Sequence, residues 1–235
     1  MKAIILAGGL GTRISEETSD KPKPMVEIGG KPMLWHIMSI FAKQGVTEFL
    51  IATGYKGNVI SDWVGTVSEP WDVRAVETGL STQTGGRIQQ CMQKYPGERF
   101  FATYGDGLGN VNLSRLLEYH QSHGKLATVT AVHPPARFGA LESDNGLVTH
   151  FAEKNQADSG WINGGYFVLE PEVAKYVNAN SEPFETGAMP RLVLERNLMS
   201  FQHSGFWQPM DTLREKQDLT KLVLNGEMPW LNITQ

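Results

Sequence analysis

The sequence contains very little cysteine and no long apolar segment. Its single cysteine, Cys91, cannot form a disulfide within the chain, and no stretch has the composition of a membrane-spanning helix. The first residues also lack the pattern of a secretory signal peptide. These absences predict a soluble cytoplasmic protein that has no disulfide framework and does not contact a membrane.

Excess positive charge is absent as well. The 235 residues include 21 lysines and arginines against 25 aspartates and glutamates, which gives a net charge of -4. There is no basic stripe of the kind that binds nucleic acid, so nucleic acid is not expected as a partner. With 40% hydrophobic and 20% charged residues and no internal repeat, the chain suits one domain with a sizeable core.

Glycine, by contrast, is concentrated next to an apolar run at the beginning of the chain. Ala3 to Leu6 is continuously apolar, as expected for a strand buried on both faces of a parallel sheet. Gly8, Gly9 and Gly11 follow, and their lack of Cβ atoms permits positive φ angles and close approach of a ligand to the backbone. Because successive N–H groups in such a turn can form an anion-binding concavity, the segment is a candidate phosphate cradle.

Two cations accompany this loop: Arg13 follows the last glycine, and Lys23 lies between Pro22 and Pro24. Both could neutralise the charge that moves during phosphoryl or nucleotidyl transfer. Other glycine-rich motifs fit less well. A dinucleotide-binding fingerprint needs glycine in place of Ile14, and no glycine leads into the Gly-Lys-Ser/Thr ending of a P-loop. A turn without any ligand stays open from the loop alone.

Strand and helix patterns alternate along the first 132 residues. Strands are expected at 48–53, 73–76, 100–103 and 127–132, separated by helices at 34–41, 59–64, 87–95 and 113–117. This alternation predicts an α/β fold, with a Rossmann-like, mostly parallel sheet flanked by helices. After His133, strands are expected at 139–142, 147–153 and 162–169, which predicts a small β-rich lobe. Helices are expected at 171–178, 188–197 and 212–224, and the two halves, 1–132 and 133–235, form one domain.

Two aspartates are candidate metal ligands. Asp106 follows a buried strand between Gly105 and Gly107, and Asp211 lies at a strand-to-helix junction. Two carboxylates from distant parts of the chain could hold one Mg2+, which takes oxygen ligands and completes its shell with substrate phosphates. The alternatives are an ordinary turn for Asp106 and a helix N-cap for Asp211.

Further candidates depend on weaker patterns. Glu153, Lys154 and Asn163 flank predicted strand ends, where they could bind a phosphate and sugar hydroxyls, or form only a solvated ion pair and a β-bulge. The second glycine-rich loop, 78–87, ends at Arg87 and could read a base edge. His120 and His123 have helical spacing that could hold a metal, although surface histidines are the preferred interpretation.

Taken together, these residues resemble the sugar-1-phosphate nucleotidyltransferases. The resemblance runs from the first residue into the final helix, and the opening loop and the Tyr104-Gly-Asp106-Gly motif identify this family. Thr84-Gly-Gly-Arg87 and Trp207-Gln-Pro-Met-Asp-Thr212 point to the branch that uses CTP. The resemblance implies the nucleotide-diphospho-sugar transferase fold, with the β-rich lobe on the sugar side. The substrates it implies are CTP and a sugar 1-phosphate, with glucose 1-phosphate favoured, and the cofactor is Mg2+.

The resemblance also assigns a role to each candidate residue. The nucleotide would be cradled by Leu6, Ala7, Gly8, Gly9, Leu10 and Gly11, with its phosphates on Thr12, Arg13 and Lys23. Thr82, Arg87 and Gly105 would also bind CTP, and Asp106 and Asp211 would hold the metal. Lys154 would bind the sugar phosphate, with Glu153 and Asn163 near the sugar hydroxyls.

Two departures from the family pattern are visible. Asn155 stands where the family has proline, and the segment between Gly57 and Glu69 is shorter than in glucose-1-phosphate enzymes of this kind. The family implies a homo-oligomer. Because the longer segment contributes subunit contacts in those enzymes, the size of the oligomer is not carried over to this chain.

Overall fold

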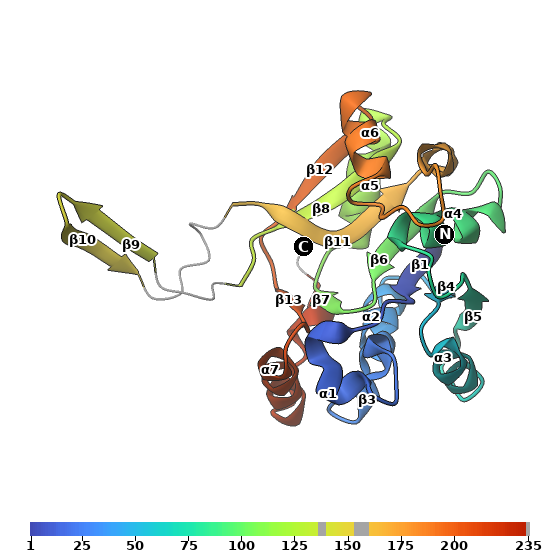
Figure 1. The fold of residues 1–235 in the computed structure, drawn as a ribbon, viewed down its shortest axis with the longest axis horizontal. Helices are drawn as coiled ribbons and strands as arrows, with labels where there is room; N and C mark the ends of the chain where they lie inside the picture. The colour runs from blue at the N-terminus through green and yellow to red at the C-terminus, as the bar shows by residue number, and fades with distance from the viewer. Residues whose placement is uncertain (136–139, 153–159, 234–235) are drawn as a thin grey trace.

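A seven-stranded sheet forms the centre of the molecule (Figure 1). The computed structural model describes residues 1–135, 140–152 and 160–233. The strands of the central sheet are Lys2–Ala7 (β1), Glu48–Thr53 (β4), Asp72–Glu77 (β5), Phe100–Tyr104 (β6), Ala127–Val132 (β8), Ile162–Leu169 (β11) and Leu198–His203 (β12). Their order across the sheet is β12-β8-β11-β6-β1-β4-β5.

Most neighbouring strands of this sheet are parallel. β6, β1, β4 and β5 run in one direction, and β12 is parallel to β8, whereas β11 is antiparallel to both β6 and β8. The prediction of an α/β fold with a mostly parallel mixed sheet is therefore confirmed. Its parallel half places the carboxyl ends of β1, β4 and β6 along one edge, where open α/β sheets bind ligands.

The β-rich lobe is smaller than the sequence pattern predicted. Ala140–Asp144 (β9) and Leu147–Ala152 (β10) form a separate antiparallel hairpin, as expected. The strand expected at 162–169 is confirmed, but its assignment to the lobe was wrong, because β11 lies inside the central sheet. Residues 164–169 are buried, so this strand needs neighbours on both of its faces.

Helices cover both faces of the sheet and enclose two apolar cores. One core contains side chains of Met33–Ala42 (α2), Gly57–Val64 (α3), Leu113–His123 (α5) and Leu213–Leu224 (α7). The other contains side chains of Thr84–Gln93 (α4), the 3-10 helix Pro171–Tyr176 (η4) and Ala188–Leu194 (α6). Ile5 belongs to the first core and Ile4 to the second, which explains why β1 is apolar at every position from Ala3 to Ala7.

The remaining elements are short. They are Thr12–Ile14 (η1), Ser15–Thr18 (α1), Lys23–Met25 (η2), Glu27–Ile28 (β2), Lys31–Pro32 (β3), Gly107–Gly109 (β7), Trp207–Pro209 (β13) and Pro229–Leu231 (η5). β2 pairs with β3, and β7 pairs with β13. Within the part of the chain described above, no helix combines the length and apolar composition needed to cross a membrane.

The interpretation of His120 as a surface histidine was wrong. Its ring is 1% exposed and contacts the Thr128 hydroxyl through Nδ1, at 2.8 Å, and the Glu170 carboxylate through Nε2, at 3.1 Å. His123 Nε2 lies 2.8 Å from the same hydroxyl, and His123 Nδ1 accepts a hydrogen bond from the Lys125 amide. The pair therefore joins α5 to the sheet, and Cys91 packs in the second core as expected.

Candidate active site

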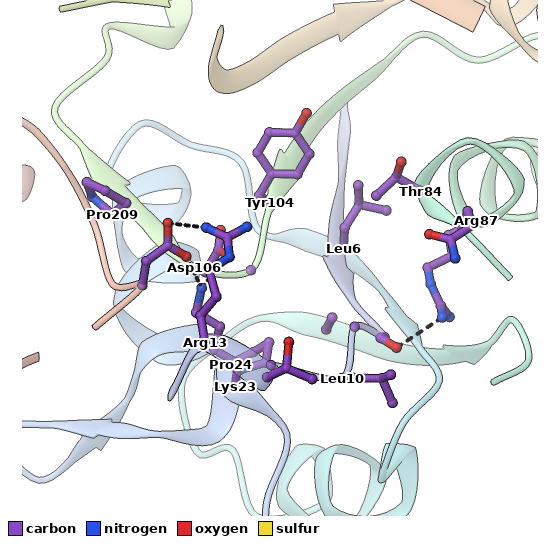
Figure 2. Close-up of a pocket in the computed structure, with 18 of the residues that line it drawn as sticks. Leu6, Leu10, Arg13, Lys23, Pro24, Thr84, Arg87, Tyr104, Asp106 and Pro209 are labelled. Carbon is purple, nitrogen blue, oxygen red and sulfur yellow. Dashed lines mark hydrogen bonds and ion pairs between the residues drawn. The ribbon is translucent and has the colours of Figure 1, made fainter. Parts of the chain in front are cut away.

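A cavity of about 680 Å³ opens at the carboxyl ends of β1 and β6 (Figure 2). Most of the residues that the sequence singled out line it, although they come from both halves of the chain. They are Leu6, Ala7, Gly8, Gly9, Leu10, Gly11, Thr12, Arg13, Lys23, Thr82, Arg87, Gly105, Asp106, Asn163 and Asp211.

Glu153 and Lys154 lie outside the described residues, so their roles on the sugar side stay predictions from the sequence.

Gly8 and Gly105 are glycine because neighbouring groups occupy the space of a side chain. A Cβ on Gly8 would lie 2.2 Å from the Arg87 guanidinium, and one on Gly105 would lie 2.6 Å from the Leu6 carbonyl oxygen. Such contacts are far shorter than van der Waals distance, so neither position tolerates alanine without displacement. The floor of the cavity is therefore built from backbone, as a phosphate cradle requires.

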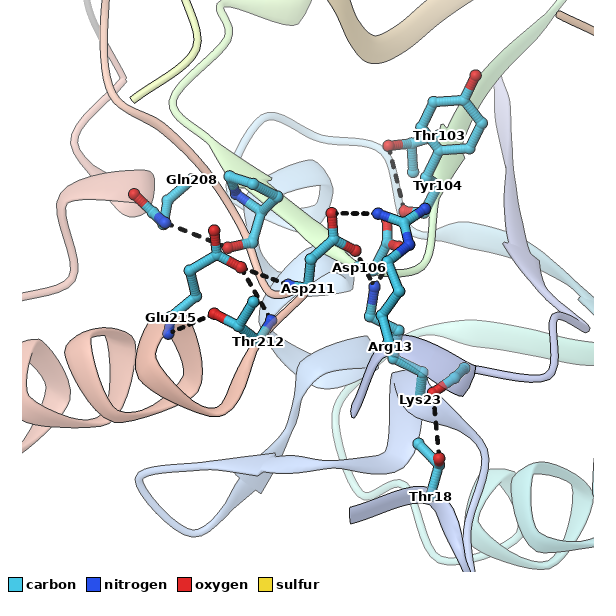
Figure 3. Close-up of polar contacts among 12 residues, drawn as sticks. Arg13, Thr18, Lys23, Thr103, Tyr104, Asp106, Gln208, Asp211, Thr212 and Glu215 are labelled. Atoms are coloured by element: carbon cyan, nitrogen blue, oxygen red, sulfur yellow. Dashed lines mark hydrogen bonds and ion pairs between the residues drawn. The ribbon is translucent and has the colours of Figure 1, made fainter. Parts of the chain in front are cut away.

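Lys23 is a nearly buried cation at one end of the cavity. It begins the 3-10 turn η2, and the whole residue is only 8% exposed. Its ammonium donates hydrogen bonds to Asp106 Oδ2 at 2.7 Å and to Asp211 Oδ1 at 2.6 Å (Figure 3). Arg13 reaches the other oxygen of Asp211 at 2.5 Å, although its side chain is 73% exposed. Two cations and two carboxylates thus share one end of the cavity.

The pairing of β7 with β13 explains why these two aspartates meet. Gly107 lies opposite Pro209 in the register, and the Met210 amide donates to the Asp106 carbonyl at 2.8 Å. Asp211 is not the N-cap of α7, which corrects one of the two interpretations of this residue. Thr212 caps the helix, and the Glu215 carboxylate accepts from the backbone amides of both Asp211 and Thr212. The Asp211 carboxylate is therefore available to the cavity.

The chemistry of this end fits a divalent cation. Asp106 and Asp211 direct carboxylate oxygens toward the same position, and the Lys23 ammonium lies between them in this structure. Mg2+ takes one or two carboxylates together with phosphate oxygens and water. Within the residues that the structure describes, no group of three or more His, Cys, Asp or Glu side chains forms a complete protein-only metal site.

Arg87 has a different environment from the one expected of a ligand-binding arginine. Its guanidinium donates to the Thr53 carbonyl at 2.7 Å, to the Thr78 hydroxyl and to the Gly8 carbonyl at 3.0 Å. The residue is 4% exposed, and burial lowers the pKa of its guanidinium. Arg87 therefore joins the opening loop to the end of β4, with one edge on the cavity.

The second glycine-rich loop also makes mainly internal contacts. Gln83 and Gly85 donate their amides to the carbonyls of Asn180 and Glu182, at 2.8 and 3.1 Å. The Thr82 hydroxyl donates to the Thr78 carbonyl, while the residue itself lines the cavity. The start of α4 is thus fixed against a segment about 100 residues later in the sequence, a contact that no local pattern indicates.

The cavity contains a second polar cluster, which the sequence analysis missed. Tyr104 Oη donates to Glu185 Oε1 at 2.6 Å, and Asn163 Nδ2 donates to Tyr104 Oη at 2.9 Å. Thr84 Oγ1 donates to Glu185 Oε2 at 2.7 Å. Tyr104 belongs to the Tyr-Gly-Asp-Gly motif, so its position was foreseeable. Glu185 lies in a loop without any motif, and only long-range contacts reveal it.

The fold and the cavity define a class of protein. A glycine-rich loop after β1, two cations and a pair of carboxylates at the carboxyl edge of a parallel sheet suit an enzyme that handles polyphosphates. The chain belongs to the nucleotidyl transferase family, whose model matches residues 2–215. The resemblance stated from the sequence is therefore confirmed.

Individual members of this family are similar to the chain along nearly its whole length. The glucose-1-phosphate cytidylyltransferase of Salmonella typhi is 45% identical, over 98% of this chain and 98% of its own length. The probable glucose-1-phosphate cytidylyltransferase of Bacillus subtilis is 40% identical, over 98% of this chain and 99% of its own. The alignment with the Salmonella typhi protein spans 253 positions, more than the 235 residues of this chain. The Salmonella protein therefore contains residues that this chain lacks.

A solved structure shares the fold. A UDP-glucose pyrophosphorylase complexed with UDP-glucose superposes with a TM-score of 0.74, over 96% of this chain and 99% of its own. Its sequence identity is 16%, so the likeness concerns the architecture of the sheet and helices.

Proposed function

We propose that the protein transfers a cytidylyl group from CTP to α-D-glucose 1-phosphate, giving CDP-glucose and pyrophosphate. The observation that carries this proposal is the 45% identity, along nearly the whole chain, to a glucose-1-phosphate cytidylyltransferase. The cavity supports it independently, because its cations, its backbone cradle and its paired carboxylates suit a triphosphate and a second phosphate.

The reaction brings two polyanions together, and this is the main barrier. An oxygen of the sugar phosphate attacks the α-phosphorus of CTP in line. The new P–O bond forms as the bond to pyrophosphate breaks, and pyrophosphate leaves with the electron pair. Phosphate monoesters have a second pKa of about 6, so the nucleophile is largely a dianion at pH 7 and needs no general base. Catalysis then depends on position and charge neutralisation.

Residues of this chain would divide that work. The backbone from Gly8 to Gly11 holds the phosphates of CTP, and Arg13 and Lys23 neutralise the charge at the reacting centre. The Lys23 ammonium is already held at the end of the cavity by Asp106 and Asp211, so little motion is needed to bring it to a phosphate oxygen. Lys154 is proposed, from the sequence alone, to bind the phosphate of the incoming sugar.

Mg2+ would be held by Asp106 and Asp211, whose carboxylates also bind Lys23. When bound, the cation supplies charge neutralisation on the phosphate oxygens. The carboxylates would then bond less to Lys23, whose ammonium would be released toward the phosphates. Asp106→Asn and Asp211→Asn should each raise the Mg2+ concentration needed for half-maximal rate by about tenfold or more, as loss of a charged ligand predicts.

That metal prediction has a matched control. Asp218 lies on α7 outside the cavity, and Asp218→Asn should leave the Mg2+ dependence unchanged. If Asp106→Asn and Asp211→Asn both show the Mg2+ dependence of the wild type, neither residue is a metal ligand. Mn2+ in place of Mg2+ gives a second readout, since its binding can be followed by paramagnetic relaxation without turnover.

The function itself is tested by a substrate panel. Purified protein is incubated with glucose 1-phosphate, Mg2+ and each of CTP, UTP, dTTP, GTP and ATP, and pyrophosphate release is measured. Turnover with CTP alone supports the proposal, whereas turnover with UTP or dTTP and none with CTP contradicts it. The alternative, transfer to a different sugar 1-phosphate, is separated by repeating the CTP assay with galactose, mannose and glucosamine 1-phosphates.

A further inference from the structure

One carboxylate in the cavity has no cation beside it among the residues that the structure describes. Glu185, in the loop before α6, lines the cavity together with Tyr104 and Thr84. Both oxygens of its carboxylate accept from neutral hydroxyls, Oε1 from Tyr104 at 2.6 Å and Oε2 from Thr84 at 2.7 Å. Among the described residues, no lysine, arginine or histidine forms an ion pair with it, whereas Asp106 and Asp211 each contact Lys23.

The hydrogen-bond directions of this cluster are fixed by its outer partners. Asn163 Nδ2 donates to Tyr104 Oη, so the tyrosine hydroxyl must direct its own proton to Glu185. The Phe184 amide donates to Thr84 Oγ1, so the threonine proton also points at the carboxylate. Burial, followed by the charge of Glu185, raises the pKa of Tyr104, which keeps the phenol protonated and donating.

Each carboxylate oxygen can accept more than one hydrogen bond, so Glu185 retains acceptor capacity toward the cavity. A phosphate cannot use that capacity, because phosphate oxygens are acceptors and carry the same charge as the carboxylate. A hydroxyl can, since it donates a proton and brings no charge. Both substrates of the proposed reaction carry vicinal hydroxyls: the ribose of CTP at C2′ and C3′, and the hexose at C2, C3 and C4.

We propose that Glu185 is a hydroxyl-binding residue of the cavity, whose carboxylate accepts hydrogen bonds from vicinal hydroxyls of a substrate. Thr84, Tyr104 and Asn163 orient this carboxylate and keep it from turning toward the phosphates. The identity of the two hydroxyl-bearing substrates rests on the proposed function, and the residue's acceptor role rests on the geometry of the cluster.

The test compares natural substrates with deoxy analogues in the wild type and in Glu185→Gln. Loss of a hydrogen bond to a charged acceptor predicts a fall in kcat/KM of about 10- to 100-fold for Glu185→Gln with the natural pair. With the analogue that lacks the bound hydroxyl, wild type and variant should differ little. Two arms identify the source: 2′-deoxy- and 3′-deoxy-CTP for the ribose, and 2-deoxy- and 3-deoxyglucose 1-phosphate for the hexose.

A purely structural role of Glu185 would give a different result. The variant would then lose the same factor with every substrate and analogue, and that result would overturn the proposal. Glu185→Asp, which keeps the charge and shortens the reach, should fall between wild type and Glu185→Gln, and it also serves if the glutamine variant fails to fold. Glu172→Gln, an exposed residue on η4 outside the cavity, is the matched control and should keep both kcat and KM.

The two proposals fail in distinguishable ways. If the wild type turns over no nucleotide with glucose 1-phosphate, the proposed reaction is wrong, and the acceptor role is tested by calorimetric binding of CTP, of glucose 1-phosphate and of their four deoxy analogues. A loss of affinity on removing one hydroxyl that Glu185→Gln abolishes supports the proposal without any turnover. Equal losses in wild type and variant for all four analogues reject it.

Discussion

Lys23 and Arg87 line the same cavity, yet their surroundings are opposite. The Lys23 ammonium contacts two carboxylates, and the Arg87 guanidinium contacts two backbone carbonyls and a hydroxyl. Within the described residues, Arg87 forms no ion pair with a carboxylate. Both residues were assigned to substrate binding from the sequence, and only the structure separates them.

This difference distinguishes a residue that can change partners from one that holds the framework. Carboxylates that bind an ammonium can exchange it for a metal ion while the ammonium turns to a phosphate, so the contacts of Lys23 are replaceable. The carbonyls bound by Arg87 belong to the ends of β4 and to the opening loop, and no substrate can replace a guanidinium between them. Lys23 should therefore affect the rate, and Arg87 the shape of the site.

Removing the charge of Lys23 should have the largest effect on the reaction rate. Lys23→Met keeps much of the side-chain volume and deletes the ammonium that would neutralise the phosphates. By analogy with the loss of one preorganised donor, kcat should fall on the order of 10²–10³-fold, measured by pyrophosphate release at saturating CTP and sugar phosphate. Lys21→Met, two residues away and outside the cavity, should change kcat little.

A result in which Lys23→Met raises KM but keeps kcat would contradict a role at the reacting centre. Such a result would show that the ammonium stabilises the bound nucleotide equally in the ground state and in the transition state.

Arg87→Lys tests whether Arg87 maintains the shape of the site. A single ammonium cannot replace the guanidinium bonds to Gly8, Thr53 and Thr78 together, so at least one buried acceptor loses its partner. The free energy of unfolding should fall by about 1–3 kcal/mol, measured by urea denaturation. Displacement of the opening loop should raise the KM for CTP about tenfold, with a smaller effect on kcat. An unchanged stability with a raised KM would instead make Arg87 a direct ligand contact.

The sequence predicted the features that depend on local patterns. Continuous apolar runs located β1, β4, β6 and β8, and the glycines around Asp106 marked the end of a strand at the cavity. The meeting of Asp106 with Asp211 was expected only because both follow strands. Its physical cause, the pairing of β7 with β13, involves segments too short to carry a periodic signal.

Residues fixed by long-range contacts could not be predicted in the same way. Glu185 reaches Tyr104 and Thr84 across 81 and 101 residues of sequence. His120 lies on the same face of α5 as the buried Leu113 and Leu116, but its partners Thr128 and Glu170 belong to or adjoin other strands and could not be identified from the sequence. The strand at 162–169 was assigned to the lobe because it follows two other strands expected after His133, and it pairs instead with β6 and β8 of the central sheet.

Lowering the pH should change the stability of the fold through His120, which does not line the cavity. Burial lowers the pKa of His120 below its ordinary value of 6.5, despite the Glu170 carboxylate and with Arg99 opposing its protonation. Protonation therefore favours the unfolded chain. The stability that neutral His120 gives is complete above pH 6.5 and is lost as the pH falls below it, by up to about 1.4 kcal/mol per pH unit.

The measurement is the free energy of unfolding by urea at pH 7.5 and pH 5.5, in wild type and His120→Gln. Burial also lowers the pKa values of His36, His123 and His203, so the wild type should lose stability over this interval. The variant should be less stable at pH 7.5 and should lose less on acidification. Equal losses in both proteins would show that His120 does not titrate between these pH values. Lys23→Met should have the same pH slope as the wild type, because its effect is confined to the cavity.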